Sequence, residues 1–189
     1  AWIEQYFLNS PDDEREEFTS AELEDLARTH RALAEIRAPK TPVVAARNDD
    51  YNTTLYVATD DMPHIVSSLT AYLSAHFGGF LAIFHPIFLA ERNTDGKLIS
   101  LRGTGTRANL ASGDTAAVGM PSLQLSEGAP EGSTVTIESW IAIRLTRCLN
   151  EDDLRLLEHD VRRVLADVRA CYTDLEGMVT AVFDISQAM

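Results

Sequence analysis

The sequence predicts an α+β fold in which an antiparallel sheet has helices packed on one face. Residues 53–59 and 134–147 alternate between the two sides of a strand and are rich in β-branched side chains. Residues 65–77 and 154–171 instead repeat apolar residues at three- and four-residue steps, which is typical of helices with one buried face. The resulting order, β-α-β-β-α, is that of a sheet whose helices are segregated to one side.

Residues 1–39 are predicted to form a helical arm in front of this core. Thr19 and Glu22 make a capping box, in which the hydroxyl and the carboxylate each accept a hydrogen bond from a backbone amide. Pro39 is predicted to end this helix. One face of the helix is apolar, with Leu23, Leu26, His30, Leu33 and Ile36. This face must pack on another part of the molecule.

Residues 41–48 and 53–59 are predicted to be strands on either side of a turn. Pro42 places the first of them at a strand start or at a sheet edge. The segment Asp60-Asp61-Met62-Pro63 then predicts a helix start, because it offers a carboxylate cap followed by proline in the first turn. Gly78 and Gly79 end this helix.

Residues 80–92 form a long predicted strand that is broken at Pro86. Residues 93–96, Asn-Thr-Asp-Gly, are a hairpin signal, and residues 97–101 follow as the return strand. Residues 102–133 then lose all periodicity and are dominated by glycine, serine, threonine and alanine. Because such length without structure is unusual inside a domain, we interpret this segment as a flexible surface insertion.

The last predicted strand, residues 134–147, leads into a long helix that Asn150 caps. The apolar stripe of this helix comprises Leu154, Leu157, Val161, Val164, Val168 and Cys171. We expect the stripe to lie on the sheet beside Ile137 or Trp140. The charged residues of the helix are expected in solvent or against another subunit; these are Arg155, Glu158, Arg162, Arg163 and Arg169.

The expected domain therefore spans residues 40–178, and the tail, residues 179–189, is predicted to be helical because apolar residues recur there at helical spacing. A ferredoxin-like sheet needs a fourth strand. Either the segment 41–48 or the tail supplies it.

The overall composition limits the kinds of partner that this chain can bind. The formal net charge of −13 argues against nucleic acid and anionic membrane, and no apolar run approaches the roughly 20 residues of a membrane-spanning helix. The first residues show no signal segment, so we expect a cytoplasmic protein that has been excised from a longer chain. Cys148 and Cys171 lack the spacing of a zinc or redox site and are interpreted as free thiols.

No catalytic or metal site is predicted. His64 and His76 are separated by three helical turns, about 18 Å, so they cannot share an ion with each other or form a set with His85. Residues 103–107, Gly-Thr-Gly-Thr-Arg, lack the third glycine and the lysine of a phosphate-binding loop. The strand-to-helix junction at Asp60 is the one candidate binding feature. Free amides at a helix start suit a carboxylate such as that of an amino acid, although a merely capped helix explains the same residues.

Several motifs occur in order and at compatible spacing. They are the segment 59–69, which contains Thr-Asp-Asp-Met-Pro-His; the segment 84–88, Phe-His-Pro-Ile-Phe; the segment 138–140, Glu-Ser-Trp; the helix end at 164–170; and the arm segment 29–37. Taken together, they resemble the N-terminal region of the large, NAD-specific glutamate dehydrogenases. The resemblance covers most of the chain and is weakest over residues 102–133.

This resemblance implies an ACT-like, non-catalytic regulatory domain, with the NAD-dependent chemistry located far downstream and no cofactor on this segment. ACT domains commonly bind an amino acid at the turn between the first strand and the first helix. The corresponding effector-binding candidates are Asp60, Asp61, Met62, His64 and Ile65. The usual glycine of that turn is absent, and His64 occupies its neighbourhood. The expected partners are other domains and subunits of a homo-oligomeric parent, and the alternative function is a structural oligomerisation or docking module.

Overall fold

The computed structural model describes residues 2–8, 10, 12–103 and 125–187. Its helices are α1 (Trp2–Tyr6), α2 (Asp12–Glu16), α3 (Ser20–Leu33), α4 (Ile65–His76) and α6 (Glu151–Gln187). Its strands are β1 (Val43–Asn48), β2 (Thr53–Asp60), β3 (Phe80–Phe84), β4 (Ile87–Arg92), β5 (Leu98–Gly103) and β6 (Thr134–Leu145). Residues 104–124, which make up most of the predicted insertion and of the glycine-rich loop, lie outside this description.

Within the described residues, six strands form one antiparallel sheet in the order β1-β2-β6-β4-β5, and β3 also pairs with β6. The predicted strand 80–92 is broken at Pro86, so that β3 and β4 pair with successive stretches of β6. Proline has no amide proton for the ladder, but its carbonyl still accepts a hydrogen bond of 3.0 Å from the Trp140 amide. Strand β1 lies beside β2 and supplies the fourth strand of the ferredoxin-like arrangement.

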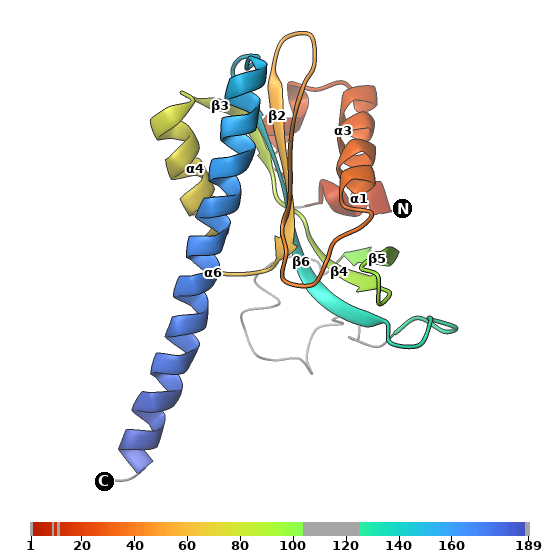
Figure 1. Ribbon diagram of the computed structural model, residues 1–189. Coiled ribbons are helices and arrows are strands. Elements are labelled where there is room, and N and C mark those ends of the chain that lie inside the picture. Colours follow the sequence, from red (N-terminus) through yellow and green to blue (C-terminus); the bar gives the residue numbers. More distant parts are fainter. Residues whose placement is uncertain (1, 9, 11, 104–124, 188–189) are drawn as a thin grey trace.

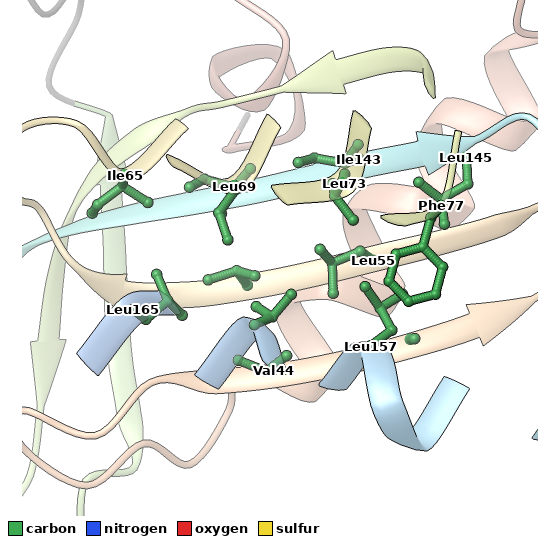
Figure 2. Packing of buried hydrophobic residues seen from close by; sticks show 14 of the residues in the cluster. Val44, Leu55, Ile65, Leu69, Leu73, Phe77, Ile143, Leu145, Leu157 and Leu165 are labelled. Carbon is green, nitrogen blue, oxygen red and sulfur yellow. The ribbon is translucent and has the colours of Figure 1, made fainter. Parts of the chain in front are cut away.

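The face of the sheet under α4 and α6 is apolar (Figures 1 and 2). Leu69 and Leu73 of α4 and Leu157 of α6 pack there against Leu55 and Ile143 of the sheet. The helical stripe predicted for α6 is confirmed, because Leu157 and Val161 are fully buried and Val164 and Val168 are partly buried against the same core.

The stripe was expected beside Ile137 or Trp140 of β6, and Trp140 lies on the other face of the sheet. Neighbouring residues of a strand point to opposite sides of a sheet. Ile141 and Ile143 of β6 face α4 and α6, whereas Trp140 and Ala142 belong to the core under the arm. Because β6 is apolar on both sides, its sequence pattern does not show which side faces which helix.

The arm covers the opposite face of the sheet (Figure 1). Tyr6, Phe7 and Leu26 of the arm pack there against Phe84 and Trp140. The two helices of the domain, α4 and α6, do share one face as predicted, but the sheet is enclosed on both sides. This enclosure explains why all residues of β2 except the last are buried.

Two helix boundaries differ from the prediction. The capping box of Thr19 and Glu22 is confirmed, yet α3 ends at Leu33, well before Pro39, and Ile36 is 65% exposed in a bridge to Lys97. Helix α4 begins at Ile65 with His64 as its N-cap residue, and no side chain caps it. The carboxylate cap predicted at Asp60 and Asp61 is therefore wrong.

Helix α6 contains 37 residues, which corresponds to about 55 Å, and it continues beyond the sheet to Gln187 (Figure 1). The helix thus includes the predicted helical tail, and the domain boundary proposed at residue 178 falls inside it. Cys148 and Cys171 are free thiols, as expected. Both are exposed, so the prediction that Cys171 belongs to the buried stripe of α6 is wrong.

The charged side of α6 also contacts the sheet edge, contrary to the expectation of a solvated face. Glu158 accepts a hydrogen bond of 2.9 Å from the Ala46 amide, and Arg162 donates one of 2.6 Å to the Val44 carbonyl. Both bonds satisfy outward-facing backbone groups of the edge strand β1. Arg155 and Arg163 are exposed as predicted.

Candidate functional site

Asp60, at the end of β2, connects three parts of the molecule. One carboxylate oxygen accepts a hydrogen bond of 2.7 Å from Arg37, at the end of the arm, and the other accepts one of 2.8 Å from Arg169 of α6. Burial raises the pKa of Asp60, but the two guanidinium groups outweigh this effect and hold the pKa below its usual value. Asp60 is therefore an ionised bridge between the arm and α6.

Glu138 lies deeper, at the centre of the same network, and is fully buried in β6. It accepts hydrogen bonds from the guanidinium groups of Arg37, at 2.9 and 3.1 Å, and of Arg92, at 2.7 and 3.0 Å. The indole nitrogen of Trp140 donates another at 2.9 Å. Burial raises the pKa of Glu138, but Arg92 and Arg37 more than compensate, so the pKa lies below its usual value. The carboxylate is thus stable as a buried anion only while both arginines stay in place.

Arg92 also holds the end of the arm to the β4–β5 hairpin. Its guanidinium donates to the carbonyls of Ala34, Glu35 and Gly96 at 3.0, 3.3 and 2.9 Å. Gly96 has a φ of 77°, and a Cβ atom there would lie 2.3 Å from the Arg37 carbonyl oxygen. Glycine is required at this position, because a side chain would separate the hairpin from the arm.

Asp61, which was also predicted to bind an effector, belongs to a separate chain of hydrogen bonds with Ser139 and His85. The Ser139 hydroxyl donates a bond of 2.5 Å to the Asp61 carboxylate, and the His85 Nε2 atom lies 3.0 Å from the same hydroxyl. Since the serine proton points to Asp61, the histidine must donate to the serine oxygen. In this arrangement His85 donates to Ser139 and cannot accept its proton, as the base of a serine nucleophile must. Among the described residues, the Asp61 carboxylate is the acceptor of that proton. The Asp61 amide is also engaged, with the Ile137 carbonyl at 3.0 Å.

Of the other residues predicted to bind an effector, two lie in the core and one lies on the surface. Met62, in the turn before α4, and Ile65, the first residue of α4, are buried and belong to the apolar core. His64 is exposed and has a φ of 66°, the left-handed conformation that glycine adopts most easily. Because α4 has no side-chain cap, its first-turn amides are free of both helical and side-chain partners.

His64 also lines a pocket of about 370 Å³ between the start of α4 and α6. The wall on the α4 side is formed by Pro63, His64 and Ser68. The α6 wall is formed by Val164, Asp167, Val168, Cys171 and Tyr172. Of the five residues predicted to bind an effector, the pocket thus involves His64, whereas Asp60 and Asp61 belong to the polar networks beside it.

Sequence reasoning missed most of the polar network. Arg37, Arg92, Glu138 and Ser139 were not predicted as site residues, and Arg169 was expected in solvent. One local signal was available, because Glu138 is the acidic residue of a strand with several large apolar side chains, and a buried carboxylate requires partners. All five motifs quoted for the family resemblance contribute to these networks, with Arg37, Asp60, Asp61, His85, Glu138, Ser139 and Arg169.

Metal and membrane features are not found in the described residues. Across residues 2–103 and 125–187 with their small gaps, no three histidine, cysteine, aspartate or glutamate side chains are grouped as metal ligands would be. In the same part of the chain, no helix has the length and hydrophobicity needed to cross a bilayer.

An antiparallel sheet, two helices on one face and a ligand-sized pocket at the first strand-to-helix turn define an ACT-type α+β domain. Comparison with protein families agrees: the family described as glutamate dehydrogenase, ACT1 domain, matches residues 2–161, and this chain belongs to that family. The match extends over the arm, the sheet and the first part of α6, so the arm is a family feature. No solved structure matches the chain.

Proposed function

We propose that this chain is a non-catalytic regulatory segment of a large NAD-dependent glutamate dehydrogenase. The parent enzyme would convert L-glutamate to 2-oxoglutarate and ammonia at a site in a later part of the polypeptide. The segment would act through α6 on other domains and subunits of a homo-oligomer. The observation that carries this proposal is the bridge from Arg37 through Asp60 to Arg169, since it connects α6 to both the sheet and the arm.

This bridge gives a physical route for regulation. Asp60 stands at the end of β2, directly before the turn that leads into α4. A ligand that shifts this turn changes the position of the carboxylate and thereby alters the ion pair with Arg169 of α6. Such coupling needs a ligand that binds one arrangement of the turn better than another.

The pocket beside His64 is the proposed effector site. Its volume of about 370 Å³ lies in the range of small-molecule sites, and its α6 wall offers Val164 and Val168 as apolar contacts. Asp167 is the carboxylate of that wall and suits an ammonium group, whereas the free amides at the start of α4 suit a carboxylate. Together these groups fit a small apolar amino acid.

The alternative is a structural docking module without an effector. The commitment of Asp60 and Asp61 to internal hydrogen bonds favours it, because these carboxylates stabilise the fold and are not available to a ligand. In that case the pocket is filled by another domain or subunit of the parent.

A titration separates the two functions. Each common amino acid is added while the thermal stability of the chain is measured, and a ligand at 100 times its dissociation constant should add about 2.7 kcal/mol. Val168→Phe, which fills the pocket, should abolish the response, and Ala166→Phe on the exposed side of α6 should preserve it. A flat response to all amino acids supports the docking module.

Activity tests the non-catalytic assignment independently. The purified chain, incubated with glutamate and NAD, is expected to show no reduction of the cofactor. Turnover that increases with protein concentration would contradict the assignment.

A further inference from the structure

A second pocket, of about 550 Å³, lies on the arm side of the sheet, away from α4 and α6. Helix α3 forms one wall with Glu22, Asp25 and Thr29. The β1–β2 hairpin and Arg144 of β6 form the other. None of the residues that line this pocket belongs to the bridge from Arg37 through Asp60 to Arg169.

Several of the charged side chains that line this pocket are already paired. Glu22 is engaged in the capping box with Thr19, and Asp49 is paired with Arg144 at 2.6 Å. The other lining arginine, Arg47, faces Glu158 of α6 at 3.7 Å. Both arginines of the pocket thus already have an anionic partner.

Two of the carboxylates that line the pocket are unpaired. Within the described residues, neither the carboxylate of Asp25 of α3 nor that of Asp50 of the hairpin has a hydrogen bond or an ion pair, and both residues are exposed. They stand on opposite walls and give the pocket an excess of negative charge. An anionic ligand is therefore disfavoured, and a cation is favoured.

Neutral groups of the pocket add to this preference. Tyr56 is largely buried, and burial, followed by the nearby charge of Asp25, raises its pKa to about 12, so that the phenol stays protonated. Its ring, together with Tyr51 at the tip of the hairpin, offers aromatic surface to a cation. The hydroxyl groups of Thr29 and Thr54 add hydrogen-bonding oxygens.

A metal ion fits this pocket poorly. A bound divalent cation needs several converging oxygen ligands, and no group of three such side chains occurs in the described part of the chain. An organic cation needs one charge partner and a partly apolar, aromatic wall, which the pocket supplies.

We propose that this pocket binds the ammonium group of a small organic amine, with Asp25 as its principal charge partner and Asp50 as a second. The amine body lies between Leu26 of α3 and the ring of Tyr56. Binding joins α3 to the β1–β2 hairpin and so stabilises the arm on the sheet.

The test is an NMR titration of the intact chain with pentylamine, which carries a positive charge at neutral pH as lysine does. Saturable shifts are expected for amides of α3 and of residues 47–56, whereas 1-pentanol, of the same length without the charge, should cause none. Asp25→Asn should weaken pentylamine binding at least about tenfold.

Glu24→Gln, a charge change on the exposed side of α3, should leave pentylamine binding unchanged. Asp50→Asn provides a second variant on the opposite wall and should weaken binding to a smaller extent. The proposal is overturned if pentylamine gives no saturable shifts, if 1-pentanol binds equally well, or if Asp25→Asn binds as the natural chain does.

Discussion

The two faces of the sheet are buried by different means. Under α4 and α6 the buried core side chains are aliphatic apart from one phenylalanine and one methionine (Figure 2). Under the arm, aromatic rings surround a buried histidine, His30, and a buried glutamate, Glu138, with two buried arginines. The core under α4 and α6 is thus apolar, with polar contacts such as the hydrogen bond of 2.6 Å from Tyr72 to Asp160 outside it, whereas the core under the arm contains directed polar contacts.

This difference explains how the end of the arm is held in position. Hydrophobic burial is nearly independent of direction and tolerates small shifts of a helix. A buried ion pair tolerates none, because a displaced partner leaves an uncompensated charge inside the protein. The arm supplies Arg37 to Glu138, so its end is held in one place, whereas α4 is held by side-chain packing.

The largest expected effect comes from Glu138→Gln. The substitution preserves the shape but removes the negative charge between Arg37 and Arg92, which are 3% and 5% exposed. Removing one partner of a buried pair costs roughly 3–5 kcal/mol. Urea melts should therefore show a large loss in the free energy of unfolding.

The matched control is Glu35→Gln, in the exposed pair with Lys97 at 3.7 Å. Exposed pairs contribute at most about 1 kcal/mol. Equal losses for the two variants would show that the arm face does not depend on its buried charges.

The apolar face is tested by Leu157→Ala. Leu157 is fully buried against the sheet, and truncation of such a leucine costs about 2–5 kcal/mol. Arg163→Ala on the exposed side of the same helix should change stability by no more than about 0.5 kcal/mol. If denaturant melts gave the reverse order, the register of α6 on the sheet would be wrong.

A smaller effect is expected from Gly96→Ala. The positive φ and the short distance from the new Cβ atom to the Arg37 carbonyl both oppose alanine. Strain of this kind costs on the order of 1–3 kcal/mol. Gly128→Ala is the control, because its φ is also positive but its Cβ atom meets nothing within 4 Å. A greater loss for Gly128→Ala would refute the contact argument.

His30 makes the arm face sensitive to pH. Its Nε2 atom lies 3.0 Å from the Val57 carbonyl, which accepts only, so this nitrogen bears the proton and Nδ1 accepts from the Tyr6 hydroxyl at 2.6 Å. A second proton would break the bond to Tyr6. Burial lowers the pKa of His30 from 6.5 to about 3.

Stability should therefore fall as the pH decreases from 6.5 towards 3, because the unfolded chain binds the proton more readily than the folded one. The slope from this single group reaches at most about 1.4 kcal/mol per pH unit. Asp60 and Glu138, whose pKa values are lowered by folding, add to the loss only below about 4.5. His30→Gln should flatten the curve between pH 6.5 and 4.5, and an unchanged slope there would assign the effect to other groups.

The sequence predicted local features well. The capping box at Thr19, the break at Pro86, the turn at Gly96 and the stripe through Leu157 are all confirmed, because each depends on residues close together in the chain. The three- and four-residue spacing of apolar residues was enough to identify the sides of α4 and α6 that pack on the sheet.

The partners of Asp60 were not predictable in the same way. An aspartate before proline and a helix has the pattern of a cap, but Arg37 and Arg169 lie 23 and 109 residues away and pair with it instead. The helix then starts late, at Ile65, with His64 in the left-handed conformation, which is uncommon for residues other than glycine. The ion pairs that engage Asp60 join segments far apart in the chain, so the local sequence pattern does not reveal them.

Hydrogen exchange on Asp60→Asn tests the central claim, that this carboxylate couples the arm to α6. Amides at the end of the arm near Arg37 and amides of α6 near Arg169 should exchange faster together, although these residues are far apart in the chain. Arg155→Ala, which removes only exposed pairs at the start of α6, should change neither region. If Asp60→Asn increased exchange only in the first turn of α4, Asp60 would be a local helix-start residue and the coupling would be contradicted.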